Sequence, residues 1–149
     1  MKLLKTVTLT ATACLALMTG SVAMADAETD IKYRQGVFKS IGGHMTGLNL
    51  ILRAGAHPED FQLHAESMAA LAGLVPKIFP AGSGDGKTGA KAEIWEDPEG
   101  FQEKVEAFTA AAENIGKVAG SSDMDEKVQA FRRLGGSCKG CHDDYRKKD

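Results

Sequence analysis

Two cysteines and a histidine near the C-terminal end of the chain have types and spacing that suit the covalent attachment of a cofactor. Cys138, Cys141 and His142 form a Cys-x-x-Cys-His motif, which is the attachment signature of c-type haem. On a helix, residues three and four positions apart share one face. Both thiols could therefore add to the haem vinyl groups while the imidazole of His142 reaches the iron from the same side. The motif predicts one covalently attached haem c per chain, with His142 as an axial iron ligand.

Three other interpretations of these cysteines stay open. A thiol–disulfide oxidoreductase needs a reactive thiolate, but the pair lies near the C-terminal end of an expected helix, where the helix dipole disfavours a thiolate. A structural zinc ion needs four ligands, whereas the remaining histidines lie on other elements, at positions 44, 57 and 64. A buried structural pair of cysteines would leave the adjacent histidine unexplained. Haem attachment is therefore the favoured interpretation.

Four stretches with apolar residues three and four positions apart predict four amphipathic helices that would position the motif. They cover residues 31–55, 61–75, 97–120 and 122–147. The second is expected to stop at Pro76, because proline lacks a backbone donor and clashes with the preceding turn. No stretch shows the alternation that is typical of a strand. The pattern predicts an all-α, antiparallel up-down-up-down four-helix bundle, with the haem in the core near the C-terminal end of the fourth helix.

Capping residues mark the starts of the last two predicted helices. Asp97 is the expected N-cap of the third helix, and Pro98 follows at the first helical position. Ser122 with Asp125 resembles a capping box and is expected to open the fourth helix. The glycine-rich segment 76–96 has no sustained periodicity, so we expect it to be a plain crossover loop.

The first helix is expected to face the other side of the haem, because its start lies level with the C-terminal end of the fourth helix in such a bundle. The apolar residue at this height is Phe38, which has no lone pair for the iron. The sequence therefore predicts a five-coordinate iron behind an apolar wall, which favours nitric oxide and carbon monoxide over dioxygen. The alternative is a low-spin, six-coordinate electron carrier with Met45 as sixth ligand, although Met45 lies about 10 Å along the helix from Phe38.

Polar side chains near the same height are candidates for contact with the haem edge. Arg34 lies one turn before Phe38, where its charge could meet the haem propionates, and Gln35 is a neighbouring donor. A solvated surface position is the alternative for Arg34. Tyr145 lies one turn from Cys141, so we expect it to pack against the porphyrin edge.

The first 25 residues predict a secretory signal peptide. Two lysines precede an apolar stretch, and Ala-Met-Ala at residues 23–25 provides the small-residue cleavage pattern. We expect cleavage before Asp26. Residues 1–25 would be lost, and residues 26–149 would form one domain in the periplasm.

Composition and charge argue against several classes of function. The chain of 149 residues is 43% hydrophobic and 26% charged, which is typical of one compact globular domain. Loss of the signal peptide would leave 16 Lys and Arg against 20 Asp and Glu. This mildly acidic balance, without a basic stripe, argues against nucleic acid or a membrane surface as a partner. No distal acid or base is visible to handle substrate protons, so we expect no enzymatic activity.

Three segments of the chain resemble cytochrome c′, the class II c-type cytochromes of the bacterial periplasm. They are IKYRQ at 31–35, EIWEDPEGF at 93–101 and CKGCHDDYRKK at 138–148, so the resemblance spans the whole mature chain. It implies a four-helix bundle, a high-spin haem, and a role in nitric oxide binding and protection or in electron transfer with a partner that the sequence does not identify. Low-spin members of the class carry a methionine ligand from the first helix, and this chain has Phe38 at the matching place.

The same resemblance implies further contacts. It places Glu93, together with Arg34 and Gln35, near the polar edge of the haem. It also implies a homodimer formed through the first two helices. Val37, Leu50 and Ile51 lie off the main apolar stripe of the first helix, and such residues hint at an exposed apolar patch for the partner.

Overall fold

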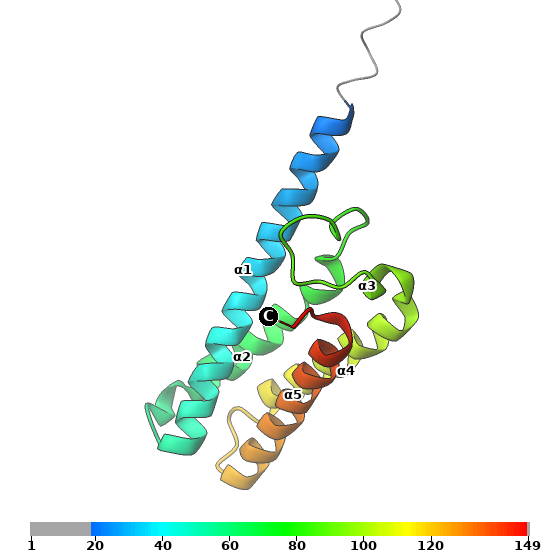
Figure 1. Ribbon diagram of the computed structural model, residues 1–149. Coiled ribbons are helices and arrows are strands. Elements are labelled where there is room, and N and C mark those ends of the chain that lie inside the picture. Colours follow the sequence, from blue (N-terminus) through cyan, green and yellow to red (C-terminus); the bar gives the residue numbers. More distant parts are fainter. Residues whose placement is uncertain (1–18, 149) are drawn as a thin grey trace, which may run out of the picture.

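The computed structural model describes residues 19–148, which form a bundle of helices (Figure 1). The elements, in chain order, are α1 (Thr19–Ala54), η1 (Pro58–Asp60), α2 (Phe61–Ala72), η2 (Val75–Lys77), α3 (Glu93–Glu96), α4 (Pro98–Lys117) and α5 (Met124–Tyr145). The helices α1, α2, α4 and α5 run alternately in opposite directions. Within residues 19–148 there is no strand, only an isolated bridge between Ala90 and Arg146. The predicted all-α, up-down-up-down four-helix bundle is confirmed.

Helix α1 begins well before the apolar stripe that starts at Ile31. Its N-terminal turns extend beyond the other helices in Figure 1. Residues 1–18 of the expected signal peptide lie outside the described residues, and the backbone of residues 19–25 belongs to α1. In the part of the chain that the structure describes, no helix combines the length and the apolar character needed to cross a bilayer.

The capping predictions are half right. Asp97 caps α4, because its Oδ1 accepts a hydrogen bond from the backbone N–H of Gly100 at 3.1 Å. The predicted cap of α5 at Ser122 is wrong by one residue. Asp123 is the cap, and its Oδ1 accepts hydrogen bonds from the first free N–H groups of α5 at 2.9 and 3.3 Å. A carboxylate at the positive end of the helix dipole gains electrostatic stabilisation that a hydroxyl does not.

The middle helices end earlier than predicted. Helix α2 stops at Ala72, and Pro76 lies in the separate 3-10 turn η2. Helix α4 stops at Lys117, before Gly120. The segment predicted as a plain crossover loop contains η2 and the four-residue helix α3, so that prediction is correct only in part.

The core lies where α2 packs against both α1 and α4, and where α4 packs against α5. Val37 and Ile51, which hint at a dimer face from the sequence, are each only 7% exposed and belong to this core. The prediction of an exposed dimer face is therefore wrong for these two residues. Leu50, the third residue of that prediction, is 50% exposed. Helix α1 therefore buries a wider face than its main stripe, and Arg34 and Gln35 near its start also contact the crossover loop.

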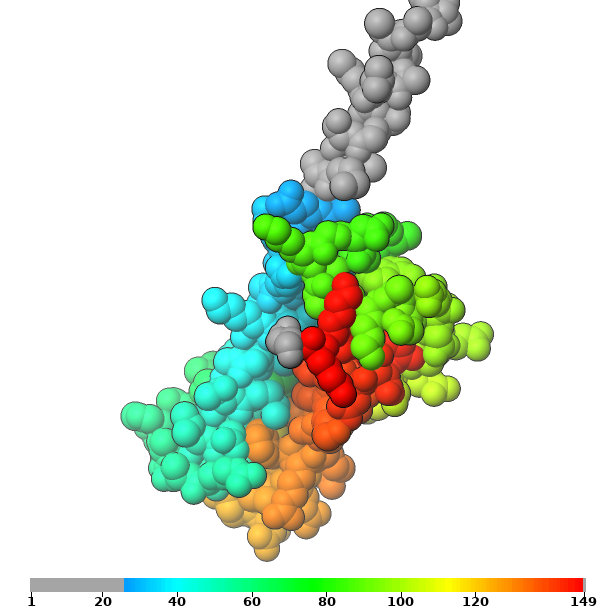
Figure 2. Space-filling view, viewed as in Figure 1, coloured from blue at the N-terminus to red at the C-terminus, as the bar shows by residue number. Residues whose placement is uncertain are grey.

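The C-terminal end of the chain is held by the crossover loop. The backbone N–H of Lys91 donates to the carbonyl oxygen of Tyr145 at 3.0 Å, and that of Lys147 donates to the carbonyl oxygen of Gly89 at 2.8 Å. Figure 2 shows the last residues, in red, beside the green loop. These hydrogen bonds fix the end of α5 against one end of the bundle.

Candidate haem-binding site

A cavity of about 600 Å³ lies between α1, α4, α5 and the crossover loop. Its volume falls within the range of about 300–1,000 Å³ that is typical of ligand and cofactor pockets. Seven of the eight predicted site residues line it: Arg34, Gln35, Phe38, Cys138, Cys141, His142 and Tyr145. Glu93 is exposed at the start of α3 and is not among the lining residues. The role of Glu93 stays a prediction.

The motif residues line the cavity from the last turns of α5. Burial raises the pKa of the Cys138 thiol. Burial also raises the pKa of the Cys141 thiol, against the opposing effect of the Lys104 ammonium. Partial burial, followed by the charge of Arg146, lowers the pKa of His142. Near neutral pH, both thiols are protonated and the imidazole is neutral, with a lone pair available to a metal.

These protonation states and the geometry weigh against the other interpretations of the motif. A thiol–disulfide oxidoreductase activates its cysteine by lowering the thiol pKa, whereas burial raises it at both positions here. Within residues 19–148, the one group of three or more ligand atoms lying within 4.8 Å of one another is formed by His57, Glu59 and Asp60. The two thiols and His142 therefore do not form the compact set of ligands that a structural zinc ion requires.

A series of aromatic rings lines the cavity from α1 to α5. Phe38 and Phe79 meet edge to face with centroids 6.0 Å apart, Phe79 and Phe101 at 4.9 Å, and Phe101 and Tyr145 at 5.2 Å. All four rings line the cavity. Sequence reasoning missed Phe79 and Phe101 as site residues. The helical period identifies Phe101 only as a core residue, and Phe79 lies in a segment that has no period to interpret.

Arg34 is buried beside this wall and holds the crossover loop. It is only 3% exposed, so a solvated surface position is wrong for this residue. Its Nη1 donates to the carbonyl oxygen of Ile78 at 3.1 Å and to Oγ of Ser83 at 2.8 Å. Its Nη2 donates to the carbonyl oxygen of Ser83 at 2.8 Å and to Oγ1 of Thr88 at 3.0 Å. The guanidinium carbon also lies 4.8 Å from the ring centroid of Phe79.

The crossover loop sets the register between α1 and α5 across the cavity. On one side, Nε2 of Gln35 donates to the carbonyl oxygen of Lys87 at 2.9 Å. On the other, the N–H of Lys147 donates to Gly89, two residues further along the loop. Residues 34 and 35 of α1 and residues 145–147 of α5 therefore contact neighbouring residues of the loop at the same end of the bundle.

This register pairs residues on opposite walls. The two helices run in opposite directions, so each step forward along α1 matches a step backward along α5, at about 1.5 Å per residue. Counting from the loop contacts puts Phe38 about level with His142 and Met45 about level with Gly135. All four residues line the cavity, but Met45 lies about 10 Å along the bundle axis from the level of His142.

The end of α5 is also anchored to α4. The hydroxyl of Tyr145 donates to Oδ2 of Asp97 at 3.1 Å, the same carboxylate that caps α4. Lys104 lines the cavity and forms an ion pair with Asp144 at 2.8 Å. The sequence gives no indication of either contact, because the partners lie 48 and 40 residues apart. Both hold the motif turn of α5 in one orientation.

The residues of the cavity fit a covalently bound haem. The wall is mostly aromatic and aliphatic, two protonated thiols and a neutral imidazole converge from one helix, and the volume suits a cofactor. A sequence model of the family described as Cytochrome C' matches residues 29–146. The chain belongs to the cytochrome c′ family.

Individual cytochromes c′ are similar to this chain along almost their whole length. Cytochrome c′ from Pararhodospirillum photometricum is 34% identical over 125 residues, which cover 82% of this chain and 99% of the relative. The structure of cytochrome c prime from Shewanella frigidimarina has a TM-score of 0.78 and 36% identity, covering 82% of this chain and 97% of that one. A nitric oxide complex of a mutant cytochrome c prime from Alcaligenes xylosoxidans has a TM-score of 0.75 and 31% identity, with the same coverage.

Membership of the cytochrome c′ family identifies the cofactor as covalently bound haem c. Cytochromes c′ bind ligands or transfer electrons and are generally not enzymes. They are typically periplasmic. The class of protein and its cofactor are therefore established, and the roles of single residues follow as proposals.

Proposed function

We propose that this cytochrome c′ holds its haem through thioether bonds at Cys138 and Cys141, with His142 as axial ligand, and binds nitric oxide or carbon monoxide on the opposite side. The register across the cavity carries this proposal, because it puts Phe38 level with His142. Phe38 has no lone pair to donate. When bound, the haem supplies an iron with one open coordination position for a small ligand.

The residues around that position favour uncharged ligands. Phe38 and Phe79 form an apolar wall of the cavity. Nearby donors are engaged elsewhere, since Tyr145 donates to Asp97 and Arg34 donates to the crossover loop. Bound dioxygen gains stability from a hydrogen-bond donor in the pocket, which is missing from this wall, whereas nitric oxide and carbon monoxide need none.

Arg34 and Gln35 are the proposed neighbours of the haem's polar edge. The guanidinium of Arg34 is a buried positive charge on the cavity wall, and such a charge favours an anionic group nearby. Its hydrogen bonds to Ser83 and Thr88 hold it in one position. A fixed cation of this kind could orient the cofactor as well as hold the loop.

The optical spectrum of the purified protein tests the proposal. We expect a high-spin spectrum in both oxidation states and a shift of the reduced spectrum when carbon monoxide is added. These results would mean an open coordination position. A sharp low-spin spectrum that carbon monoxide does not change would mean a sixth protein ligand and would contradict the proposal.

A second candidate is a low-spin electron carrier with Met45 as the sixth ligand. One observation favours it, namely that Met45 lines the same cavity. The distance of about 10 Å along the bundle argues against it, because a methionine side chain would have to reach past two turns of α1.

We also propose that the protein is exported and forms a homodimer. Residues 1–25 have the pattern of a cleaved signal peptide. Leu50 of α1 and Leu63 of α2 are 50% and 62% exposed, and exposed apolar residues on these two helices suit a partner copy. Native mass spectrometry of protein recovered from the periplasm is expected to show a dimer of chains that begin at Asp26. A monomer would contradict the dimer, and a chain that retains residues 1–25 would contradict export by cleavage.

A further inference from the structure

Two histidines meet where α1 packs against α2, and neither lines the haem cavity. His44 of α1 and His64 of α2 are partly buried, and their Nδ1 atoms lie 2.9 Å apart. The ring centroids are 5.1 Å apart and the rings are inclined by 68°. Within residues 19–148, this is the one polar contact of either ring.

Gly47 makes the close approach of His64 to α1 sterically feasible. A Cβ atom at position 47 would lie 2.6 Å from Cε1 and 2.7 Å from Nε2 of His64. Real Cβ atoms do not come so close to another heavy atom, so any other residue would displace the imidazole. The absence of a side chain at Gly47 therefore allows the two histidines to meet.

We propose that His44 and His64 together bind a divalent transition metal ion of the class that prefers imidazole, such as zinc, and so link α1 to α2. Such ions bind histidine nitrogens at about 2.0–2.1 Å. Two ligands at a right angle are then about 2.9 Å apart, and two tetrahedral ligands about 3.3 Å apart. The observed Nδ1 separation matches the first value and needs an adjustment of about 0.4 Å to reach the second. Water would complete the coordination of a two-histidine site.

The proton positions in the histidine pair are compatible with replacement of the hydrogen bond by a metal ion. In the hydrogen bond, one ring carries a proton on Nδ1 and donates it to the hydrogen bond, and Nδ1 of the other ring is the acceptor. On metal binding, the donating ring loses that proton to solvent and takes one up at Nε2. Both imidazoles stay neutral, and both Nδ1 lone pairs become available. The histidines come from two packed helices, so the ligand atoms are held close before the metal arrives.

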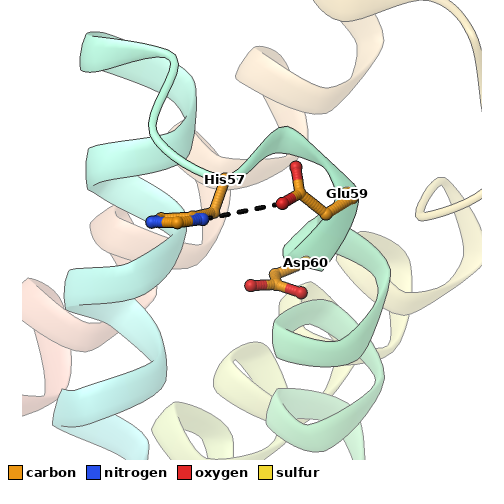
Figure 3. Close-up of side chains that lie close together, drawn as sticks. All are labelled: His57, Glu59 and Asp60. Atoms are coloured by element: carbon orange, nitrogen blue, oxygen red, sulfur yellow. Dashed lines mark ion pairs between the residues drawn. The ribbon is translucent and has the colours of Figure 1, made fainter.

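A second group of potential ligands provides the natural control. Figure 3 shows His57, Glu59 and Asp60 together at the turn between α1 and α2. Nδ1 of His57 lies 3.5 Å from Oε1 of Glu59, and these side chains are 79% and 69% exposed. The group is exposed to solvent, and its members lie within four consecutive residues. Removal of His57 therefore tests nonspecific surface binding of the same metal.

Zinc titration of the haem-loaded protein by isothermal calorimetry tests the proposal. We expect one zinc ion per chain, and we expect His44→Gln and His64→Gln each to weaken binding at least about tenfold. Glutamine keeps a polar side chain but puts no ligand atom at the Nδ1 position. His57→Gln is expected to bind zinc as the unaltered protein does. Unchanged zinc affinity in both His44→Gln and His64→Gln, or loss of zinc binding only in His57→Gln, would overturn the proposal.

Gly47→Ala provides a variant that retains both imidazoles. Alanine favours a helix more than glycine does, so the fold is expected to persist while the His64 ring is displaced. We expect weaker zinc binding in this variant. Zinc is also expected to raise the urea midpoint of the unaltered protein and to leave that of Gly47→Ala nearly unchanged, because zinc would bridge the two helices only through the paired imidazoles. If Gly47→Ala binds zinc as tightly as the unaltered protein, or if zinc raises both urea midpoints equally, the site does not depend on the pairing of His44 with His64.

Discussion

Phe38→Met is expected to convert the iron from high-spin to low-spin and to lower the affinity for carbon monoxide at least about tenfold, or about 1.4 kcal/mol. The substitution puts a thioether at the level of His142, on the opposite wall of the cavity. Methionine is similar to phenylalanine in size and adapts to irregular spaces, so the surrounding residues need little rearrangement. Optical spectra of the oxidised and reduced variant, with and without carbon monoxide, measure both effects.

Met45→Leu is the matched control for Phe38→Met. It removes the other thioether of α1 that lines the cavity, but at the level of Gly135 rather than His142. We expect its spectra and its response to carbon monoxide to equal those of the unaltered protein. If the unaltered protein is low-spin and Met45→Leu is high-spin, Met45 is the sixth ligand, and the alignment of Phe38 with His142 is wrong. A high-spin Phe38→Met that still binds carbon monoxide would also contradict the predicted position of Phe38.

The sequence predicts the parts of the site that have a local signature. The spacing of Cys138, Cys141 and His142 identifies the cofactor without any structure. The helical period of α1 and α5 then puts Phe38 at the height of the motif, because both helices are long and strongly patterned. Seven of the eight predicted site residues line one cavity for this reason. Only Glu93, taken from a family resemblance rather than from a period, lies outside it.

Contacts that depend on the crossover loop could not be predicted in the same way. Phe79 and the loop partners of Arg34 lie in a glycine-rich segment with no hydrophobic period, 44 to 54 residues from Arg34 in sequence. The stripe alone also misjudges Val37, which is buried in the core cluster although it lies off the main apolar stripe of α1. The contact between His44 and His64 also could not be predicted from the helical period. His44 lies off the apolar stripe of α1, and the contact requires glycine at position 47.

Arg34→Met is expected to lower the free energy of unfolding by about 2–4 kcal/mol, which corresponds to a shift of about 1–2 M in the urea midpoint. Four hydrogen bonds from the buried guanidinium hold the crossover loop. Methionine fills much of the same space but donates none of them, so the carbonyl oxygens of Ile78 and Ser83 lose a charged donor in a buried region. Urea unfolding of the haem-loaded protein, followed by circular dichroism, gives the change.

The position of the guanidinium, and not only its charge, should determine this stability. Arg34→Lys keeps the charge, but a single ammonium group cannot reach acceptors on Ile78, Ser83 and Thr88 together, so we expect a smaller but clear loss. Lys32→Met removes a cation from the same helix at an exposed position, where Lys32 forms an exposed ion pair with Glu28, and is expected to change stability by less than about 0.5 kcal/mol. An Arg34→Met protein as stable as Lys32→Met would mean that the loop does not depend on Arg34. The register between α1 and α5 would then rest on the hydrogen bonds of Gln35 and Lys147 to the loop, without a contribution from Arg34.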